Sequence, residues 1–357
     1  MWHFSLIRSD TGAVLNDLND AVDRRISFKL NQPTEFTFKV AGTSETARAL
    51  GTLTTDIYIA WDALLLARCR VGSTTDTLDE NDHQVDVSAL DYVALLDRRY
   101  AHQAISYTAQ DLTFIAWDLI DYTQRRDPAP AGDWGITRGL TAVTANVNFA
   151  VADGKKLGEA IADVRNTFPE FDYEIDGALK FNCWAMRGTQ RDFALEYGGN
   201  VSQITRTVDT ANYANRVRQS GADGLAPAVR QASDLATRPE KRIEAQEGNT
   251  DLANTALIGW AADAYLQRHG TLYATYTCKL NPAAGWDPTQ LWLGDRAWVV
   301  IDSGRLAVQT LERVFQIDVE VGNDGQTDTS VSFGDFQEDI LAMFHAVPAS
   351  LEQINRR

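Results

Sequence analysis

The chain has 357 residues, 44% of them hydrophobic, and its 49 acidic and 33 basic residues give a net charge of −16. This length predicts two or more domains, and the acidic balance argues against a sequence-specific nucleic-acid binder, because such proteins attract phosphates with Lys and Arg. No run of about 20 apolar residues predicts a membrane helix, and the N-terminus lacks a signal-peptide pattern, so we expect neither a membrane protein nor a secreted one.

The first hundred residues predict β-structure. Ile26, Phe28 and Leu30 alternate with polar residues before a turn at residues 31–33, and the same pattern follows it. Denser apolar runs at 56–61 and 64–72 precede an acidic stretch at 74–83. We interpret that stretch as a solvated hairpin tip. Its carboxylates do not follow the spacing of an EF-hand calcium loop; they are Asp76, Asp79 and Asp82.

Residues 107–126 give the clearest helix signal. Thr108 and Asp111 have capping-box spacing. Five apolar residues then recur on one helical face and predict its buried side: Leu112, Ile115, Ala116, Leu119 and Ile120. The prolines of residues 127–135 predict the end of this helix.

A second helix and a hairpin are predicted next. The helix begins near Asp153 and buries a stripe that runs to Pro169. Its stripe consists of Leu157, Ile161, Val164 and Phe168. Residues then alternate on both sides of an Asp176-Gly177 turn, which predicts two paired strands. The alternating residues are Phe171, Tyr173, Ile175, Leu179, Phe181 and Cys183. Residues 107–186 therefore predict a small α+β domain.

The later part of the chain predicts strands on both sides of a third helix. Residues 200–221 have strand-like spacing, and residues 222–242 are polar and typical of a loop. The helix covers 250–270, and Gly270 is suited to its C-terminal end. One row of this helix consists of Leu252, Ala256, Trp260 and Ala264. Strands follow at 271–280, 291–301, 306–321 and 327–333, which favours a second barrel or sandwich.

The sequence contains none of three common catalytic or nucleotide-binding motifs. The serine-hydrolase pattern GxSxG and the metalloprotease pattern HExxH do not occur, and Gly154-Lys155 has Phe149 where a P-loop needs its first glycine. Asp295 follows Gly294 between two apolar strands, and we interpret it as ordinary turn chemistry. The histidines are scattered, which lowers the odds of a triad or metal site. They are His3, His83, His102, His269 and His345.

Cysteine and tryptophan usage leaves one enzymatic alternative open. Cys69, Cys183 and Cys278 are odd in number and far apart, so we expect reduced thiols. Nine tryptophans with abundant carboxylates could serve a glycan-cleaving enzyme. However, Trp117 and Trp260 lie in predicted helices and Trp298 lies in a predicted strand. We therefore expect at least some of the tryptophans to belong to the core. We predict no catalytic, cofactor-binding or metal-binding residues.

Several stretches together resemble the tail-hub minor tail proteins of siphophages, especially those that infect actinobacteria. These are "DYVALLDRR" at 91–99, "IAWDLI" at 115–120, "GITRGL" at 135–140, "NYANRVRQSG" at 212–221 and "LGDRAWVVID" at 293–302. The resemblance covers about residues 1–336 and rests on structural patterns rather than catalytic signatures. The chain lacks the long C-terminal peptidase or lysin extension of larger hubs, which argues against wall cleavage.

The resemblance implies a mainly β, α+β chain with two tail-tube-like β-barrel domains and a small α+β domain inserted between them. The expected division is a first barrel at 1–104, an α+β insertion at 105–200, connecting strands, loop and helix at 201–269, a second barrel at 270–336 and a C-terminal tail at 337–357.

The function implied by the resemblance is a structural one at a phage tail tip. A homotrimer would form a ring that continues the tail tube, assembled in the host cytoplasm and carried by the virion. Its partners would be the tail-tube or distal tail protein, the tape measure protein and other tail-tip proteins. An acidic lumen would let DNA pass without binding. The alternative is a carbohydrate-active enzyme that cleaves cell-wall glycan with paired carboxylates and exposed Trp.

Overall fold

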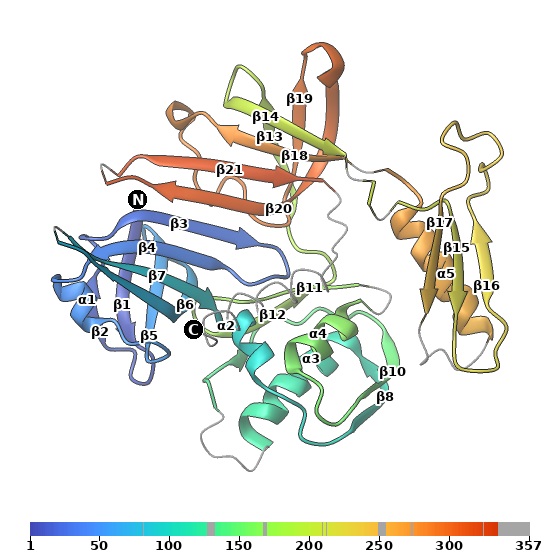
Figure 1. Cartoon of the computed structure of the whole chain (residues 1–357), viewed down its shortest axis with the longest axis horizontal. Helices are drawn as coiled ribbons and strands as arrows, with labels where there is room; N and C mark the ends of the chain where they lie inside the picture. Colours follow the sequence, from blue (N-terminus) through green and yellow to red (C-terminus); the bar gives the residue numbers. More distant parts are fainter. Residues whose placement is uncertain are drawn as a thin grey trace. The chain divides into compact units, whose positions relative to one another are not determined.

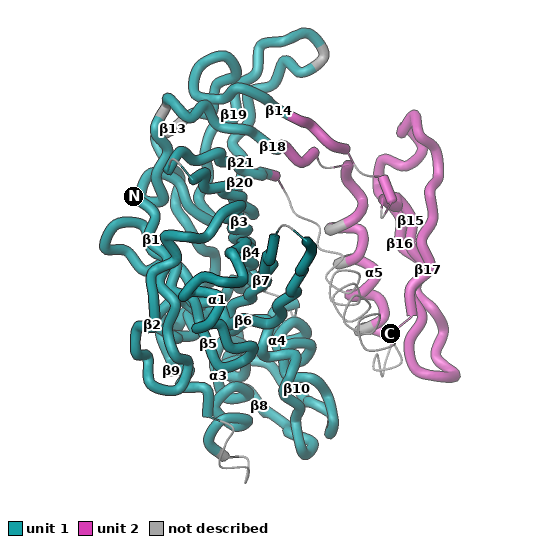
Figure 2. The backbone as a smooth tube through the Cα atoms, turned by 60° about the vertical axis from the view of Figure 1, so that its left-hand side comes forward, with its two compact units in different colours: residues 1–204, 277–333 teal, residues 205–276, 334–357 magenta. Residues whose placement is uncertain are grey.

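A computed structural model describes residues 1–80, 82–126, 133–166, 170–208, 210–211, 213–248, 255–272, 274–323 and 325–334. Within these ranges the chain is mainly β, and the fold class predicted from the sequence is confirmed. The chain divides into two units (Figure 2), and the boundary falls within strands at 204–205 and 276–277. Unit 1 contains residues 1–204 and 277–333, and unit 2 contains residues 205–276 and 334–357.

The elements follow one another from a β-rich start through mixed segments to a β-rich end (Figure 1). The first strands are β1 (Trp2–Arg8), β2 (Val14–Asp17), β3 (Val22–Lys29), β4 (Glu35–Ala41), β5 (Thr55–Trp61), β6 (Leu64–Leu78) and β7 (His83–Asp91), with α1 (Glu45–Ala49) between β4 and β5. The mixed segment contains α2 (Tyr92–Leu95), η1 (Leu96–Arg98), β8 (Ile105–Asp111), α3 (Leu112–Asp121), η2 (Tyr122–Arg126), β9 (Thr137–Arg138), β10 (Asn146–Val151), α4 (Leu157–Arg165), β11 (Asp172–Ile175) and β12 (Lys180–Trp184).

The remaining elements complete both units. They are β13 (Gln190–Glu196), β14 (Val201–Val208), β15 (Arg216–Ser220), β16 (Ala228–Gln231), β17 (Glu244–Gly248), α5 (Thr255–His269), β18 (Ala274–Leu280), η3 (Pro282–Ala284), β19 (Arg296–Ile301), η4 (Gly304–Leu306), β20 (Val308–Val321) and β21 (Thr327–Phe333). Among the described residues, no helix is both long and apolar enough to cross a bilayer.

One large sheet joins the two ends of the sequence. Its strand order is β14-β18-β21-β20-β3-β4-β7-β6-β5-β1-β2, and β13 and β19 branch from it at β20. The alternation predicted around residues 31–33 is confirmed, because β3 and β4 pair antiparallel and bury their apolar residues on one face. That face contributes Ile26, Phe28, Phe36, Phe38 and Val40 to the core.

β20 is the strand that makes this sheet continuous. Its first half, from Val308 to Arg313, pairs with β19, and its second half pairs with β3 on one side and β21 on the other. β13 and β14 come before the three-stranded sheet of unit 2 in sequence, yet β13 pairs with β19 and β14 with β18. The strands that follow α5 in sequence therefore share their sheet with strands that come before residue 209.

The predicted α+β region has its own core in unit 1. The five stripe residues of α3 are buried, together with Leu157, Ile161 and Val164 of α4. Phe168 and Pro169 of the predicted stripe lie outside the described residues. The alternating residues of the hairpin β11–β12 are all buried too, so the predicted change of period from helix to strand is confirmed.

The predictions of helix starts and of one turn were less accurate than those of the elements themselves. Thr108 lies in β8, and Asp111 caps α3 by accepting from the backbone N–H groups of Thr113 and Phe114. α4 begins at Leu157 rather than near Asp153. The β11–β12 turn extends to Leu179, which has a φ of 58° in place of the predicted Asp-Gly pair.

Unit 2 contains a three-stranded sheet, β16-β15-β17, and α5, which lies against it (Figure 1). β16 and β17 were missed, because residues 222–248 are too polar to show strand alternation. The buried side of α5 carries Ile258 and Ala262, not the predicted row. Of that row, Ala256 and Trp260 are exposed, and Leu252 lies outside the described residues.

Candidate functional site

The candidate site is a polar face on the large sheet of unit 1. We define the polar face as the outward side chains of β18, β21, β20, β3 and β4 around a hollow of about 370 Å³. They are Arg25, Ser27, Glu35, Thr37, Lys279, Asp318, Glu320, Asp328 and Ser330.

Strand register places these residues in rows across the sheet. In one row, Arg25 of β3 lies opposite Glu320 of β20 and Thr37 of β4. In the next row, Ser27 lies opposite Asp318 and Glu35. The neighbouring residues point to the other face and are buried, so period-two alternation separates the polar face from the core.

The two cations of the polar face are each paired with a carboxylate. Arg25 Nη2 lies 3.3 Å from Glu320 Oε1, and Lys279 Nζ lies 3.0 Å from Asp328 Oδ2. All four side chains are exposed, so each pair contributes little to stability. The consequence is electrostatic: with four carboxylates and two paired cations, the face offers a phosphate backbone no net attraction.

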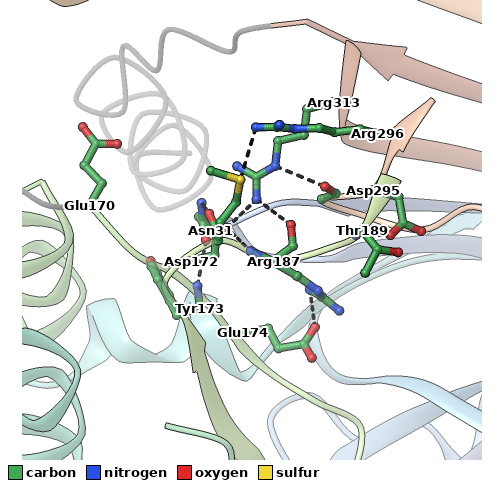
Figure 3. A network of polar contacts seen from close by, with 12 residues as sticks. Asn31, Glu170, Asp172, Tyr173, Glu174, Arg187, Thr189, Asp295, Arg296 and Arg313 are labelled. Atoms are coloured by element: carbon green, nitrogen blue, oxygen red, sulfur yellow. Dashed lines mark hydrogen bonds and ion pairs between the residues drawn. The ribbon is translucent and has the colours of Figure 1, made fainter. Parts of the chain in front are cut away.

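A buried junction holds the α+β region onto this sheet (Figure 3). The Asp172 carboxylate of β11 accepts hydrogen bonds from Asn31 Nδ2 at 2.9 Å, from the Arg187 backbone N–H at 2.6 Å and from Arg313 Nη2 of β20. Asn31 Oδ1 in turn accepts from the Tyr173 N–H at 2.8 Å. The junction thus connects the β3–β4 turn, the β11–β12 hairpin and β20.

Arg313 also binds two backbone carbonyls at this junction. It donates from Nη2 to the Arg187 oxygen at 3.0 Å and from Nε to the Gly294 oxygen at 3.2 Å. Gly188 and Gly294 have φ values of 90° and 85°, and a Cβ on Gly188 would lie 2.1 Å from the Gly294 carbonyl carbon. Only glycine permits two backbones to approach so closely.

Asp295 belongs to this junction, so its description as ordinary turn chemistry was incomplete. It is 2% exposed and accepts from the backbone N–H groups of Thr189 and Trp292, each at 2.9 Å. Arg191 Nε donates to it at 2.8 Å. These bonds join the start of β19 to the chain that leads into β13. A sequence signal was present in the Gly294-Asp295 pair, but its long-range partners were not.

Glu174 and Arg187 add an ion pair beside the same junction, with 2.6 Å between Oε2 and Nη1. Burial raises the pKa of the Glu174 carboxyl, and the positive charge of Arg187 opposes that rise. Burial is the larger effect, so the pKa of this carboxyl stays above its ordinary value. The pair therefore has the character of a structural contact.

A second group of buried charged residues contacts the start of residues 91–99, the "DYVALLDRR" stretch. Asp56 is fully buried and accepts from Arg68 Nε at 2.7 Å, Arg70 Nε at 2.9 Å and the Tyr92 hydroxyl at 2.7 Å. Asp91 caps α2 and accepts from the Thr34 N–H at 2.8 Å. Burial raises the pKa of Asp91 to about 7, although backbone hydrogen bonds from Thr34 and Val93 lower it in part.

The other sequence candidates do not converge. Asp79 and Asp82 form the β6–β7 hairpin tip, where the Asp82 N–H donates to Asp79 Oδ1 at 2.9 Å, so the hairpin interpretation is confirmed. The described residues contain no cluster of three His, Cys, Asp or Glu side chains arranged to hold a metal ion. His345 lies outside the described residues.

The cysteines and tryptophans have mixed outcomes. All three cysteines are free thiols and buried, as predicted, and burial raises the pKa of each. Trp117 packs partly buried against the α+β core. Trp298 is 38% exposed and Trp260 70%, so neither is a core residue. β19 instead buries Ala297, Val299 and Ile301.

Comparison with solved structures shows the fold. A tail protein from Neisseria meningitidis matches with a TM-score of 0.66 and 14% identity, over 95% of this chain and 97% of that one. The 43 kDa tail protein of prophage MuSo2 from Shewanella oneidensis matches with a TM-score of 0.66 and 14% identity, over 93% and 97%. The prophage tail protein gp18 from Listeria monocytogenes matches with a TM-score of 0.63 and 10% identity, over 98% and 99%.

Comparison by sequence adds nothing to this. No protein-family model matches the chain, and no curated protein matches it significantly. At 10–14% identity, the structural likeness establishes a shared fold, and this chain has the fold of these phage tail proteins along nearly its whole length.

Proposed function

We propose that this chain is a structural tail-hub protein of a bacteriophage, located at the tail tip of the virion. The observation that carries the proposal is the fold shared with three tail proteins over at least 93% of this chain and 97% of each of theirs. Agreement over complete chains supports a common assembly role more strongly than agreement over one domain does.

We assign the two barrel-like domains of such a hub to two groups of strands in the large sheet. The first group is β1 to β7, and the second is β13, β14 and β18 to β21. The α+β region joins the first group to the second, and residues 209–273 are inserted within the second group. On this proposal the order stays barrel, α+β, barrel, and the second barrel would begin near residue 190 instead of 270.

Assembly into a homotrimeric ring would cover exposed sheet edges. β2 and β14 end the large sheet, and each pairs on one side only within the described residues. Unpaired edge groups invite strand pairing, and a closed ring of copies satisfies them. Two barrel-like domains in each of three copies would give six similar units, which suits a junction with a sixfold tube.

The polar face is the surface that we assign to the channel wall. Its carboxylates outnumber its cations, and both cations are paired, so a passing DNA backbone would meet repulsion rather than a binding site. The ring would contact the tail-tube or distal tail protein, the tape measure protein and other tail-tip proteins.

An imaging reconstruction of the particle tests the proposal. We expect three copies in one ring at the tail tip, with Asp318, Glu320 and Asp328 facing the lumen. Six copies in a ring, or a lumen lined chiefly by Lys and Arg, would contradict it. Hydrolysis of cell-wall glycan by the purified chain would instead support the carbohydrate-active alternative.

A further inference from the structure

Two stretches of the α+β region contain no Asp, Glu, Lys or Arg. They are residues 100–110 and residues 139–152, which together make 25 residues. Because 23% of the whole chain is charged, about six charged residues would be expected among 25. The structure brings the two stretches together, since β8 pairs antiparallel with β10 and forms a two-stranded ribbon beside α3 and α4 (Figure 1).

This ribbon has an inner and an outer face. Val151 of β10 belongs to the core of the α+β region, and Val147 and Phe149 pack against that core. The alternate residues of β10 are exposed, as period-two alternation requires. The exposed residues of the ribbon are all uncharged and include Ser106, Thr108, Gln110, Asn146, Asn148 and Ala150.

The chain that leads into β10 adds two exposed apolar side chains. Leu140 is 62% exposed and Val143 88%. Backbone hydrogen bonds hold this segment against β12, because the Cys183 N–H donates to the Leu140 oxygen at 2.8 Å and the Ala142 N–H donates to the Cys183 oxygen at 3.2 Å. Val143 comes three residues before β10, which is at most about 11 Å along the chain. We call the exposed residues of 100–110 and 139–152 the uncharged surface.

Charged residues flank the uncharged surface rather than interrupt it. Asp111 ends β8, and its carboxylate is used within the chain, because it accepts from the Thr113 N–H at 2.9 Å and from the Thr144 N–H at 2.6 Å. Arg138 and Asp153 bound the second stretch. A centre depleted of charges and a polar rim are the composition of a protein–protein interface, and exposed apolar residues at the centre agree with it.

Charge also indicates the occupant. Two copies of a chain with a net charge of −16 repel each other wherever their charges meet. A surface without charges is where a second copy can approach at the least electrostatic cost, whereas a basic partner would be drawn to the carboxylates elsewhere. Within the described residues, β8 and β10 form a sheet of two strands, so each keeps one edge that can pair with a strand of another copy.

We propose that the uncharged surface is a contact between copies of this chain. The inference rests on the proposed homotrimer, because it names the surface through which neighbouring copies of the ring meet. Another tail protein on this surface is the competing outcome of the test.

Charge substitution at Val143 in the full chain tests this contact, and sedimentation equilibrium over a concentration series measures the self-association of the purified protein. We expect Val143→Asp and Val143→Lys each to weaken association by about tenfold or more, because a charge of either sign would be buried there without a partner. Leu78→Asp and Leu78→Lys are matched controls, since Leu78 is also apolar and exposed but lies in the acidic β6–β7 hairpin. They should change association by less than about threefold and in opposite directions.

Two results in solution would overturn the proposal. Opposite effects of Val143→Asp and Val143→Lys, or effects no larger than those at Leu78, would mean that long-range repulsion explains them. A wild-type chain that stays monomeric up to about 1 mM would also overturn the contact.

The particle reconstruction separates this inference from the proposed function. We expect residues 139–152 of one copy to contact another copy of the chain. A trimeric ring in which these residues face another tail protein or solvent would overturn the inference and leave the proposed function standing. A particle without such a ring would overturn the proposed function, whereas association that both Val143 variants weaken would still support a contact between copies.

Discussion

Replacing Asp172 by Ala should cost about 3–5 kcal/mol of unfolding free energy, because it leaves buried partners of the junction without their carboxylate. Asp172 is 4% exposed and accepts from Asn31, from the Arg187 backbone and from the Arg313 guanidinium. Hydrogen bonds to a charged group are worth about 1.5–3 kcal/mol each, and they are not additive. Urea denaturation followed by tryptophan fluorescence measures the loss.

Three further variants separate the charge from the packing. Asp172→Asn keeps one acceptor oxygen and should lose about half as much. Asp10→Ala removes an exposed pair with Arg8 and should leave the unfolding free energy nearly unchanged, because exposed ion pairs contribute little. In a double-mutant cycle, Asp172→Ala and Arg313→Met should couple by more than about 1 kcal/mol. A loss for Asp172→Ala no larger than that for Asp10→Ala would refute the assigned role of the junction.

Three other outcomes follow from single residues. Since the raised pKa of Asp91, about 7, means that folding favours its protonated form, the contribution of Asp91 to stability should fall between about pH 4 and pH 7, and Asp91→Asn should remove that part of the pH dependence in urea titrations at each pH. Gly188→Ala should lower the Tm by more than about 5 °C in thermal scans, because its Cβ would meet the Gly294 backbone. Val299→Ala should cost about 2 kcal/mol in urea, and Trp298→Ala less, the reverse of their size order.

The repeating pattern of apolar residues predicted the elements well. The stripe of α3 and the alternation of β3, β4, β11 and β12 depend on neighbours within a few residues, and all were found where expected. Caps and turns were less predictable. Thr108 has the spacing of a capping residue in the sequence, but Asp111 caps α3. β8 continues through Thr108 to Asp111, so the helix begins three residues later than the capping-box pattern indicates.

The sidedness of elements depended on tertiary partners that the sequence does not reveal. Trp260 and Trp298 lie in apolar stretches, yet both are exposed, because the neighbouring positions face the sheet or the core. The role of Asp295 was hidden for a related reason. Two of its partners, Thr189 and Arg191, are more than a hundred residues away in sequence.

The acidic residues are not spread evenly along the chain. The net charge of −16 suggested an acidic lumen. Residues 205–276 of unit 2, however, contain eight basic and eight acidic residues, so this range contributes nothing to the net charge. The acidic stretch at residues 312–328 places three carboxylates on the polar face, and β3 brings Arg25 to one of them from the other end of the chain. A channel wall built from this face would be acidic, and because its cations are paired with carboxylates they would be less able to bind a phosphate. Arg25→Gln should therefore leave DNA retention on the purified protein unchanged at low salt, whereas Glu320→Gln, which frees Arg25, should increase it; an equal response of both variants would contradict the pairing argument.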